Sequence, residues 1–201
     1  MIKAITFDLD GVYFTSDSFR NFKNALPKTV SDPEIIDFVF FKSDQQLQFR
    51  CGQISETDFW TYVKTTLGVH LSNDDVFSLL ANHYQINSQV SEVVNKIREL
   101  GLKTAICSNN NVTRIRELDK KFNFLADFDI KVFSYDVGVT KPDPRIYQAL
   151  ISQSGCIPSE IIYSDDKPEN VTTAQELGIN AFPYLDFDDF QNHLRSLGVA
   201  I

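Results

Sequence analysis

The stretch Phe7-Asp8-Leu9-Asp10-Gly11-Val12 places two aspartates around a single leucine, directly after an apolar run. The apolar residues from Ile2 to Phe7 predict a short buried strand, which Gly11 ends. At an extended strand end, side chains two positions apart point the same way, so we expect Asp8 and Asp10 in one small volume. Their like charges repel, and such a pair is costly unless a cation or a shared proton compensates. A solvated Asp-Gly turn is the alternative interpretation of these six residues alone.

The chain has 201 residues and a net charge of −8, which is enough length for one domain with a sizeable insertion or for two small domains. Nucleic acids and anionic membranes need a basic face, so we expect neither as a partner. The cysteines are three in number and have no paired spacing, which indicates reduced thiols. No signal peptide or apolar stretch of membrane-spanning length is visible, and this favours a cytoplasmic protein.

Residues 16–84 show helical periodicity and no convincing strand. Helix starts are predicted at Ser31-Asp32-Pro33, at Ser55 and at Ser72, because these residue types cap helices or open their first turn. An apolar stripe at four-residue spacing then follows the second start. This segment is predicted to form a small helical bundle.

From residue 87 onward, helical and strand patterns alternate along the chain. Short apolar strands are predicted at residues 103–107, 130–133, 161–163 and 180–182, with helices between them. Alternating β and α elements predict an α/β fold with a parallel, Rossmann-like sheet, right-handed crossovers and helices on both faces. Ligands of such sheets gather outside the carboxyl ends of the strands.

Polar residues follow the predicted strands at those ends. Ser108-Asn109-Asn110 ends one strand, Asp165-Asp166 ends another, and Lys141 precedes a helix that starts near Pro144. Together with the first two aspartates they would gather carboxylates, a hydroxyl and a lysine on one rim. This combination is typical of a site for a phosphate group and a metal ion.

Three motifs resemble those of the haloacid dehalogenase-like hydrolase superfamily, in its phosphatase branch. They are Phe7–Val12, the stretch from Val137 to Pro144, and Asp165-Asp166-Lys167-Pro168-Glu169-Asn170. The resemblance covers nearly the whole chain. It implies an α/β core formed by residues 1–15 and 85–201, with a helical cap formed by residues 16–84.

The resemblance also implies a role for each matching residue. Asp8 would be the nucleophile, and Asp10 the general acid and base. Ser108 and Lys141 would hold the phosphoryl group. A Mg²⁺ ion would be bound by Asp8, the main-chain carbonyl of Asp10 and Asp166, with Asp165 acting through a water or as a hydrogen-bond acceptor behind the ligands.

The chemistry of these residue types agrees with those roles. A carboxylate is ionised at neutral pH and can form an aspartyl-phosphate without an activating base. A pKa pushed upward by neighbouring carboxylates would suit Asp10. The backbone N–H groups of Asn109 and Asn110 would add an anion-receptive helix start. Asn170 is expected to orient Lys141 or the acidic loop.

The helical cap is expected to exclude water and to select the leaving group. Arg50, predicted in a turn between cap helices, is the first candidate for a substrate contact. Lys42 and Arg20 are further cationic candidates. Three aromatic residues could line the entrance, although packing among aromatic side chains is the simpler interpretation: Tyr13, Phe14 and Trp60.

We therefore predict a Mg²⁺-dependent phosphatase for a small phosphorylated metabolite, present as a monomer or weak homodimer. The family's dehalogenases lack a carboxylate at the position of Asp10, so its presence favours phosphoryl transfer over carbon–halogen cleavage. A phosphomutase with the same intermediate is one alternative. A catalytically silent regulator that binds a phosphorylated metabolite is the other.

Overall fold

A computed structural model describes residues 1–15, 17–25, 32–70 and 72–201 of the chain. Its strands form one parallel sheet in the order β3-β2-β1-β4-β5. Strands β2 to β5 cover the four stretches predicted from the sequence, and the predicted parallel pairing is confirmed. The strand bounds are β1 (Ala4–Phe7), β2 (Lys103–Ser108), β3 (Ile130–Phe133), β4 (Ile161–Asp165) and β5 (Asn180–Pro183).

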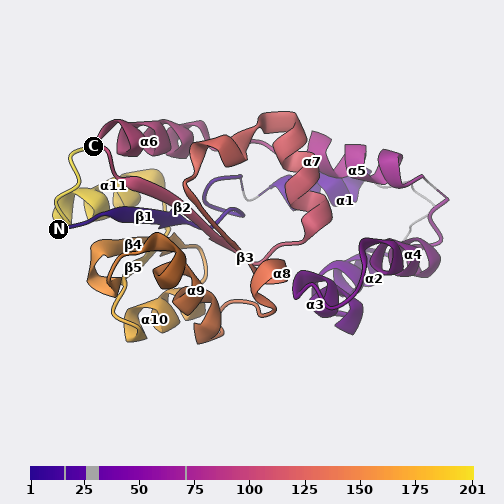
Figure 1. The fold of residues 1–201 in the computed structure, drawn as a ribbon. Coiled ribbons are helices and arrows are strands. Elements are labelled where there is room, and N and C mark those ends of the chain that lie inside the picture. Colours follow the sequence, from indigo (N-terminus) through magenta and orange to yellow (C-terminus); the bar gives the residue numbers. More distant parts are fainter. Residues whose placement is uncertain (16, 26–31, 71) are drawn as a thin grey trace.

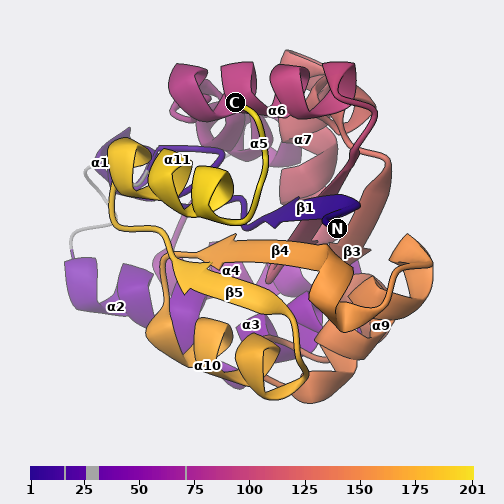
Figure 2. The same ribbon diagram turned by 90° about the vertical axis from the view of Figure 1, so that its left-hand side faces the viewer.

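Helices cover both faces of the sheet, as predicted. Figure 2 shows α6 (Ser88–Glu99) and α11 (Phe187–Ser196) on one face, and α9 (Pro144–Ser154) and α10 (Pro168–Glu176) on the other. Successive strand residues alternate between the two cores, as a pleated strand requires. In β1, Ile5 and Phe7 belong to the hydrophobic core shared with α6 and α11, and Ala4 belongs to the core shared with α9 and α10. The sheet is therefore buried on both sides, which is usual for parallel sheets.

From residue 18 to residue 82, the regular elements of the described chain are all helical. These elements are α1 (Ser18–Ala25), α2 (Pro33–Asp37), the π-helical turn η1 (Phe38–Lys42), α3 (Asp44–Arg50), α4 (Glu56–Leu67) and α5 (Asn73–Asn82). In Figure 1, α2, α3 and α4 lie together, away from the sheet. Helix α5 instead packs against α7 (Val112–Phe122), and α3 contacts the short helix α8 (Ser134–Val137).

The predicted helix starts in this segment are confirmed where they can be compared. The side chains of Asp32, Ser55 and Ser72 accept hydrogen bonds from backbone N–H groups of the first turns of α2, α4 and α5. Such caps satisfy donors that a helix start leaves without partners. Ser31, which opened the first predicted start, lies outside the described residues.

Other helix boundaries differ from the sequence prediction. The helix that starts at Pro33 becomes π-helical at Phe38, whose side chain is half exposed. Arg50 is the last residue of α3 and not part of a turn. The helix expected between the strands at residues 161–163 and 180–182 begins at Pro168, because proline suits a first helical position. No described helix is long and apolar enough to cross a membrane.

Candidate active site

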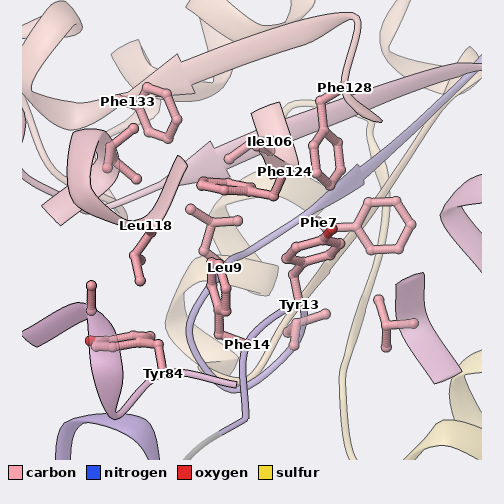
Figure 3. Close-up of a cluster of buried hydrophobic side chains, with 14 of the residues drawn as sticks. Phe7, Leu9, Tyr13, Phe14, Tyr84, Ile106, Leu118, Phe124, Phe128 and Phe133 are labelled. Atoms are coloured by element: carbon pink, nitrogen blue, oxygen red, sulfur yellow. The ribbon is translucent and has the colours of Figure 1, made fainter. Parts of the chain in front are cut away.

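Leu9 anchors the segment that carries the two aspartates. It is completely buried in the aromatic cluster of Figure 3, near Phe7 and Phe14, while Asp8 and Asp10 both line a cavity. The backbone N–H of Asp8 donates to Ser164 O in β4 at 3.1 Å. The expectation that both carboxylates share one small volume is therefore confirmed.

Gly11 makes the turn after the aspartates. Its φ is +79°, a left-handed conformation that suits glycine. The backbone closes through hydrogen bonds from Gly11 N to Phe14 O at 2.9 Å and from Phe14 N to Leu9 O at 2.7 Å. A Cβ atom at this glycine would lie 2.9 Å from Asp166 Oδ2. The turn thus brings the first motif into direct contact with the acidic residues after β4.

Lys141 is buried between two carboxylates. Its Nζ lies 3.0 Å from Asp8 Oδ1 and 2.6 Å from Asp165 Oδ2. The same ammonium donates to Cys107 O at 2.9 Å and to the Tyr163 hydroxyl at 3.1 Å. The side chain is therefore held by partners from three strands or their ends, at a fixed place beside Asp8.

The adjacent residues Asp165 and Asp166 have different surroundings. Asp165 is fully buried and accepts hydrogen bonds from Asn170 Nδ2 at 2.9 and 3.0 Å, from Lys167 N at 2.9 Å and from the Tyr163 hydroxyl. Asp166 is exposed and lines the cavity. Asn170 orients the acidic loop, as predicted. Asp165 secures Lys141, while Asp166 stays available to a ligand.

The residues after β2 hold the loop that carries Lys141. Lys141 N donates to Asn109 Oδ1 at 2.7 Å, and Asn109 Nδ2 donates to Lys141 O at 3.0 Å. Ser108 is buried, and its Oγ lies 3.5 Å from Asn110 Nδ2. Asn110 N donates to Ser134 Oγ at 3.0 Å. The expectation that the Asn110 N–H is free to bind an anion is therefore wrong, because α8 occupies it.

Three carboxylates gather tightly enough to surround a cation. Ligand oxygens of Asp8, Asp165 and Asp166 lie within 4.8 Å of one another. Carboxylate oxygens are the donors that Mg²⁺ prefers. Both oxygens of Asp165 already accept hydrogen bonds from Asn170, so Asp8 and Asp166 are the two side chains with lone pairs to offer. The donor set fits Mg²⁺.

Burial and the lysine act in opposite directions on the charged groups. Burial raises the pKa of Asp8 to about 6, although Lys141 opposes the shift. Burial also opposes the charge of Lys141, but Asp8 and Asp165 outweigh it and the pKa of Lys141 is raised. For Asp165, Lys141 outweighs burial, and the pKa of that carboxyl is lowered. Lys141 and Asp165 are thus a charged pair, and Asp8 is the one of these three groups in which burial outweighs the attraction of its charged neighbours.

A cavity of about 170 Å³ lies over these groups and reaches the helical segment. Arg50 from α3 and Phe41 from η1 line it together with the aspartates and Lys141. Lys42 is exposed and does not line this cavity. The Arg20 side chain lies outside the described residues.

Other candidates from the sequence are parts of the core. Tyr13, Phe14 and Trp60 are fully or almost fully buried, as the packing interpretation predicted. Cys107 is buried beside the site, and burial raises its pKa to about 12, which leaves it a poor nucleophile. All three cysteines are unpaired.

Arg114 is the site residue that sequence reasoning missed. It lies in the first turn of α7, three residues after the N-cap Asn111, and donates to Asp10 Oδ2. Its guanidinium also lies 5.3 Å from the centre of the Tyr84 ring. The helix dipole opposes a cation in a first turn. A buried arginine there is a local conflict of the kind that marks functional contacts, and this was the available signal.

Comparisons with known proteins agree with the fold. The family model described as haloacid dehalogenase-like hydrolase matches residues 2–178. The phosphorylated carbohydrates phosphatase of Thermotoga maritima is 30% identical over 185 residues, which cover 89% of this chain and 82% of that protein. The D-ribitol-5-phosphate phosphatase of Bacteroides thetaiotaomicron is 23% identical, with 96% of this chain and 97% of that one covered. Other curated relatives are longer, and the match covers only 10% or 39% of them.

A solved structure of the same family has a similar fold. It is a HAD family enzyme of Bacteroides thetaiotaomicron in complex with magnesium and inorganic phosphate. The two chains superpose with a TM-score of 0.75 at 25% sequence identity, and the match covers 91% of this chain and 94% of that one.

Proposed function

Since this chain belongs to the haloacid dehalogenase-like hydrolase family, we propose that it is a Mg²⁺-dependent phosphatase that hydrolyses a small phosphomonoester through an aspartyl-phosphate. The observation that carries the proposal is the buried carboxylate of Asp8, 3.0 Å from Lys141 Nζ at the floor of the cavity. A nucleophile for phosphoryl transfer needs a positively charged neighbour, because the transferred group is itself rich in negative charge.

The first half of the proposed reaction transfers the phosphoryl group to the enzyme. A carboxylate oxygen of Asp8 attacks phosphorus, and the bond from phosphorus to the leaving oxygen breaks. Asp10 gives its proton to that oxygen, so the product leaves as an alcohol. Lys141 holds the transferred group, and Ser108 is proposed to donate its hydroxyl to it. Asn109 contributes by fixing the backbone of Lys141.

The second half returns the enzyme to its starting state. Asp10, now ionised, takes a proton from a water molecule as that water attacks phosphorus. The bond between phosphorus and Asp8 breaks, and inorganic phosphate leaves. In both halves Asp10 must stay at the mouth of the cavity, where its contact with Arg114 positions it.

Mg²⁺ would be held by Asp8, Asp166 and the main-chain carbonyl of Asp10. When bound, it supplies positive charge to the phosphoryl oxygens. Asp165 is proposed to act behind these ligands, by fixing Lys141.

Residues 16–84 are proposed to act as the cap of this core. Arg50 and Phe41 bring side chains from this segment to the cavity. Arg116 in α7 forms an ion pair of 2.8 Å with Glu56 in α4, and the Glu56 carboxylate also accepts from Thr113 Oγ1 at 2.7 Å. A cap in this position would exclude water and select the leaving group.

The deciding experiment measures phosphate release from a wide panel of phosphorylated sugars, acids and nucleotides, with Mg²⁺ or with EDTA. Release that requires Mg²⁺ and falls at least about 1,000-fold in Asp8→Asn supports the proposal. Asp188→Asn, an exposed aspartate on α11, serves as the matched control and should keep full activity. Trapped reaction mixtures should contain a phosphorylated Asp8 peptide in mass spectrometry. Undiminished turnover by Asp8→Asn would refute the mechanism, and isomer formation without free phosphate would indicate a mutase.

A further inference from the structure

Two arginines face the same cavity from different parts of the fold. Arg50 ends α3 in the helical segment, and Arg114 opens α7 beside the sheet. Both line the main cavity, and both line a smaller adjoining cavity of about 20 Å³. The Nε atoms of both are buried and have no hydrogen-bond partner within the described chain. These two Nε–H groups are therefore unsatisfied hydrogen-bond donors, and water has little access to them.

The other buried cations of the site already have acidic partners, whereas Lys167, which also lines the cavity, is exposed to water. Lys141 lies between two carboxylates, and Arg114 pairs with Asp10. Arg50 differs, because no carboxylate of the described residues forms an ion pair with it. Its guanidinium lies 5.9 Å from the centre of the Phe41 ring, which orients the group but adds no negative charge.

An unpaired guanidinium in this position is energetically unfavourable. Burial and the like charge of Arg114 both lower the pKa of Arg50, although arginine stays protonated. A charge removed from water is costly until an opposite charge joins it. An anion placed between the two arginines would remove that cost and would use their free N–H donors. Arginine can bind a carboxylate or phosphate through two parallel hydrogen bonds.

The position of the arginines identifies which part of a substrate they would meet. Attacking and leaving oxygens lie roughly in line in phosphoryl transfer, so the leaving group points away from Asp8. Asp10, the proposed proton donor to that group, is the residue that Arg114 contacts. Arg50 and Phe41 come from the proposed cap, which covers the same side. The arginines therefore lie beside the leaving group and not beside the transferred phosphoryl group.

We propose that the substrate carries a second anionic group on its leaving-group side, a carboxylate or a second phosphate, and that Arg50 and Arg114 bind it. This inference rests on the phosphatase function proposed above and narrows its substrate class to small phosphomonoesters that also carry a carboxylate or a second phosphate. Arg114 has five N–H donors, so it can hold this group while keeping its contact with Asp10.

Matched substrate pairs test the inference. The pair 3-phosphoglycerate and glycerol 3-phosphate differs by a carboxylate, and the pair fructose 1,6-bisphosphate and fructose 6-phosphate differs by a phosphate. We expect kcat/KM to favour the member with the additional anionic group in at least one pair by about 10- to 100-fold, the equivalent of one or two charge-assisted hydrogen bonds. The pair with the larger preference identifies the group.

Variants then assign the preference to the arginine. Arg50→Gln should bring the ratio within the preferred pair close to one, and Arg50→Lys should restore part of it. Lys42→Gln removes the same charge from an exposed residue outside the cavity, so it should leave the ratio unchanged. Circular dichroism checks that each variant is folded. A ratio near one in the wild type, or a ratio that Arg50→Gln does not alter, would refute the inference.

A binding measurement separates this inference from the phosphatase proposal. 3-Phosphonopropionate and propylphosphonate differ by a carboxylate and are not hydrolysed. If a second anionic group is bound, the first should bind more tightly to the wild type, and Arg50→Gln should remove the difference. Tighter binding without phosphate release from any substrate, including p-nitrophenyl phosphate, would sink the phosphatase proposal and keep the anion site. Equal binding of the two phosphonates, with phosphate release intact and no preference within either substrate pair, would refute the anion site and keep the phosphatase proposal.

Discussion

Arg114 donates a hydrogen bond to the carboxylate of Asp10 across 104 positions of sequence. The arginine is buried and the aspartate is partly exposed, so the buried side chain fixes the position of the more exposed one. The contact joins the first turn of α7 to the turn after β1. It is the link by which the helix after the second strand positions the proposed general acid.

Replacing Arg114 by glutamine should lower kcat/KM for all substrates by about 10- to 100-fold, because Asp10 loses the partner that positions it. The pH profile of kcat/KM should also shift, which a merely structural role would not cause. Steady-state kinetics between pH 5 and 9 provide the measurement. Arg98→Gln, which breaks the 3.0 Å pair with Asp127 far from the cavity, is the control and should change neither quantity.

Replacing Asp8 by asparagine should abolish turnover and stabilise the metal-free protein at pH 7.5. The pKa of Asp8 is raised from its ordinary 3.8 to about 6, so the folded state binds more protons than the unfolded state between these values. Stability therefore falls as pH rises from about 4 to 6, and the ionised carboxylate opposes folding above that range. Thermal unfolding in EDTA should give a higher Tm for Asp8→Asn at pH 7.5 and a flatter dependence on pH. A lower Tm than wild type would contradict the expected cost of this charge.

The two adjacent aspartates after β4 should respond differently to the same substitution. Asp165→Asn removes the closest partner of buried Lys141 and should lower the free energy of unfolding by about 3 kcal/mol or more. Asp166→Asn should leave unfolding in EDTA nearly unchanged, because this side chain is exposed. It should instead weaken Mg²⁺ binding by at least about 10-fold. Denaturant unfolding and calorimetric titration with Mg²⁺ measure the two effects, and equal effects of both variants on stability would be the contrary result.

Gly11 and Gly198 offer a matched pair of glycine substitutions. Both have a φ near +80°, but a new Cβ would meet Asp166 Oδ2 at 2.9 Å only at Gly11, and nothing within 4 Å at Gly198. Gly198→Ala should cost about 1 kcal/mol from its backbone alone. Gly11→Ala should cost more and should also weaken Mg²⁺ binding, because Asp166 must move. Calorimetric Mg²⁺ titration of both variants is the test, and equal affinities would show that Asp166 adjusts freely.

Much of the candidate site could be predicted because the relevant residues follow strands directly. The carboxyl ends of parallel strands share one edge, so Asp8 after β1 and Asp166 after β4 are neighbours whatever the intervening chain does. Leu9 could also be placed, since an apolar residue between two aspartates points to the core. These positions follow from the local sequence pattern and from the parallel order of the strands in the sheet.

The remaining features depend on packing between distant segments. The backbone N–H of Asn110 pairs with Ser134 because α8 lies beside the end of β2, and no pattern in the sequence announces α8. Asp165 and Asp166 are chemically identical, so only the family resemblance distinguished them in the sequence, whereas in the structure their neighbours bury Asp165 and leave Asp166 exposed. Arg114 reaches Asp10 only after α7 has docked against the sheet.

Gly52 follows Arg50 by two residues, and a Cβ there would clash with the backbone oxygen of Tyr135 in α8. The backbone of Gly52 therefore packs directly against the backbone of Tyr135 just after α3 ends, and position 52 has no room for a side chain. The backbone contact between Gly52 and Tyr135 fixes the end of α3, and with it the position of Arg50 at the cavity. The side chains on the outer surface of α3 are not part of this contact. Substitutions on that surface can consequently change solubility or crystal packing while the guanidinium stays aimed at the same point.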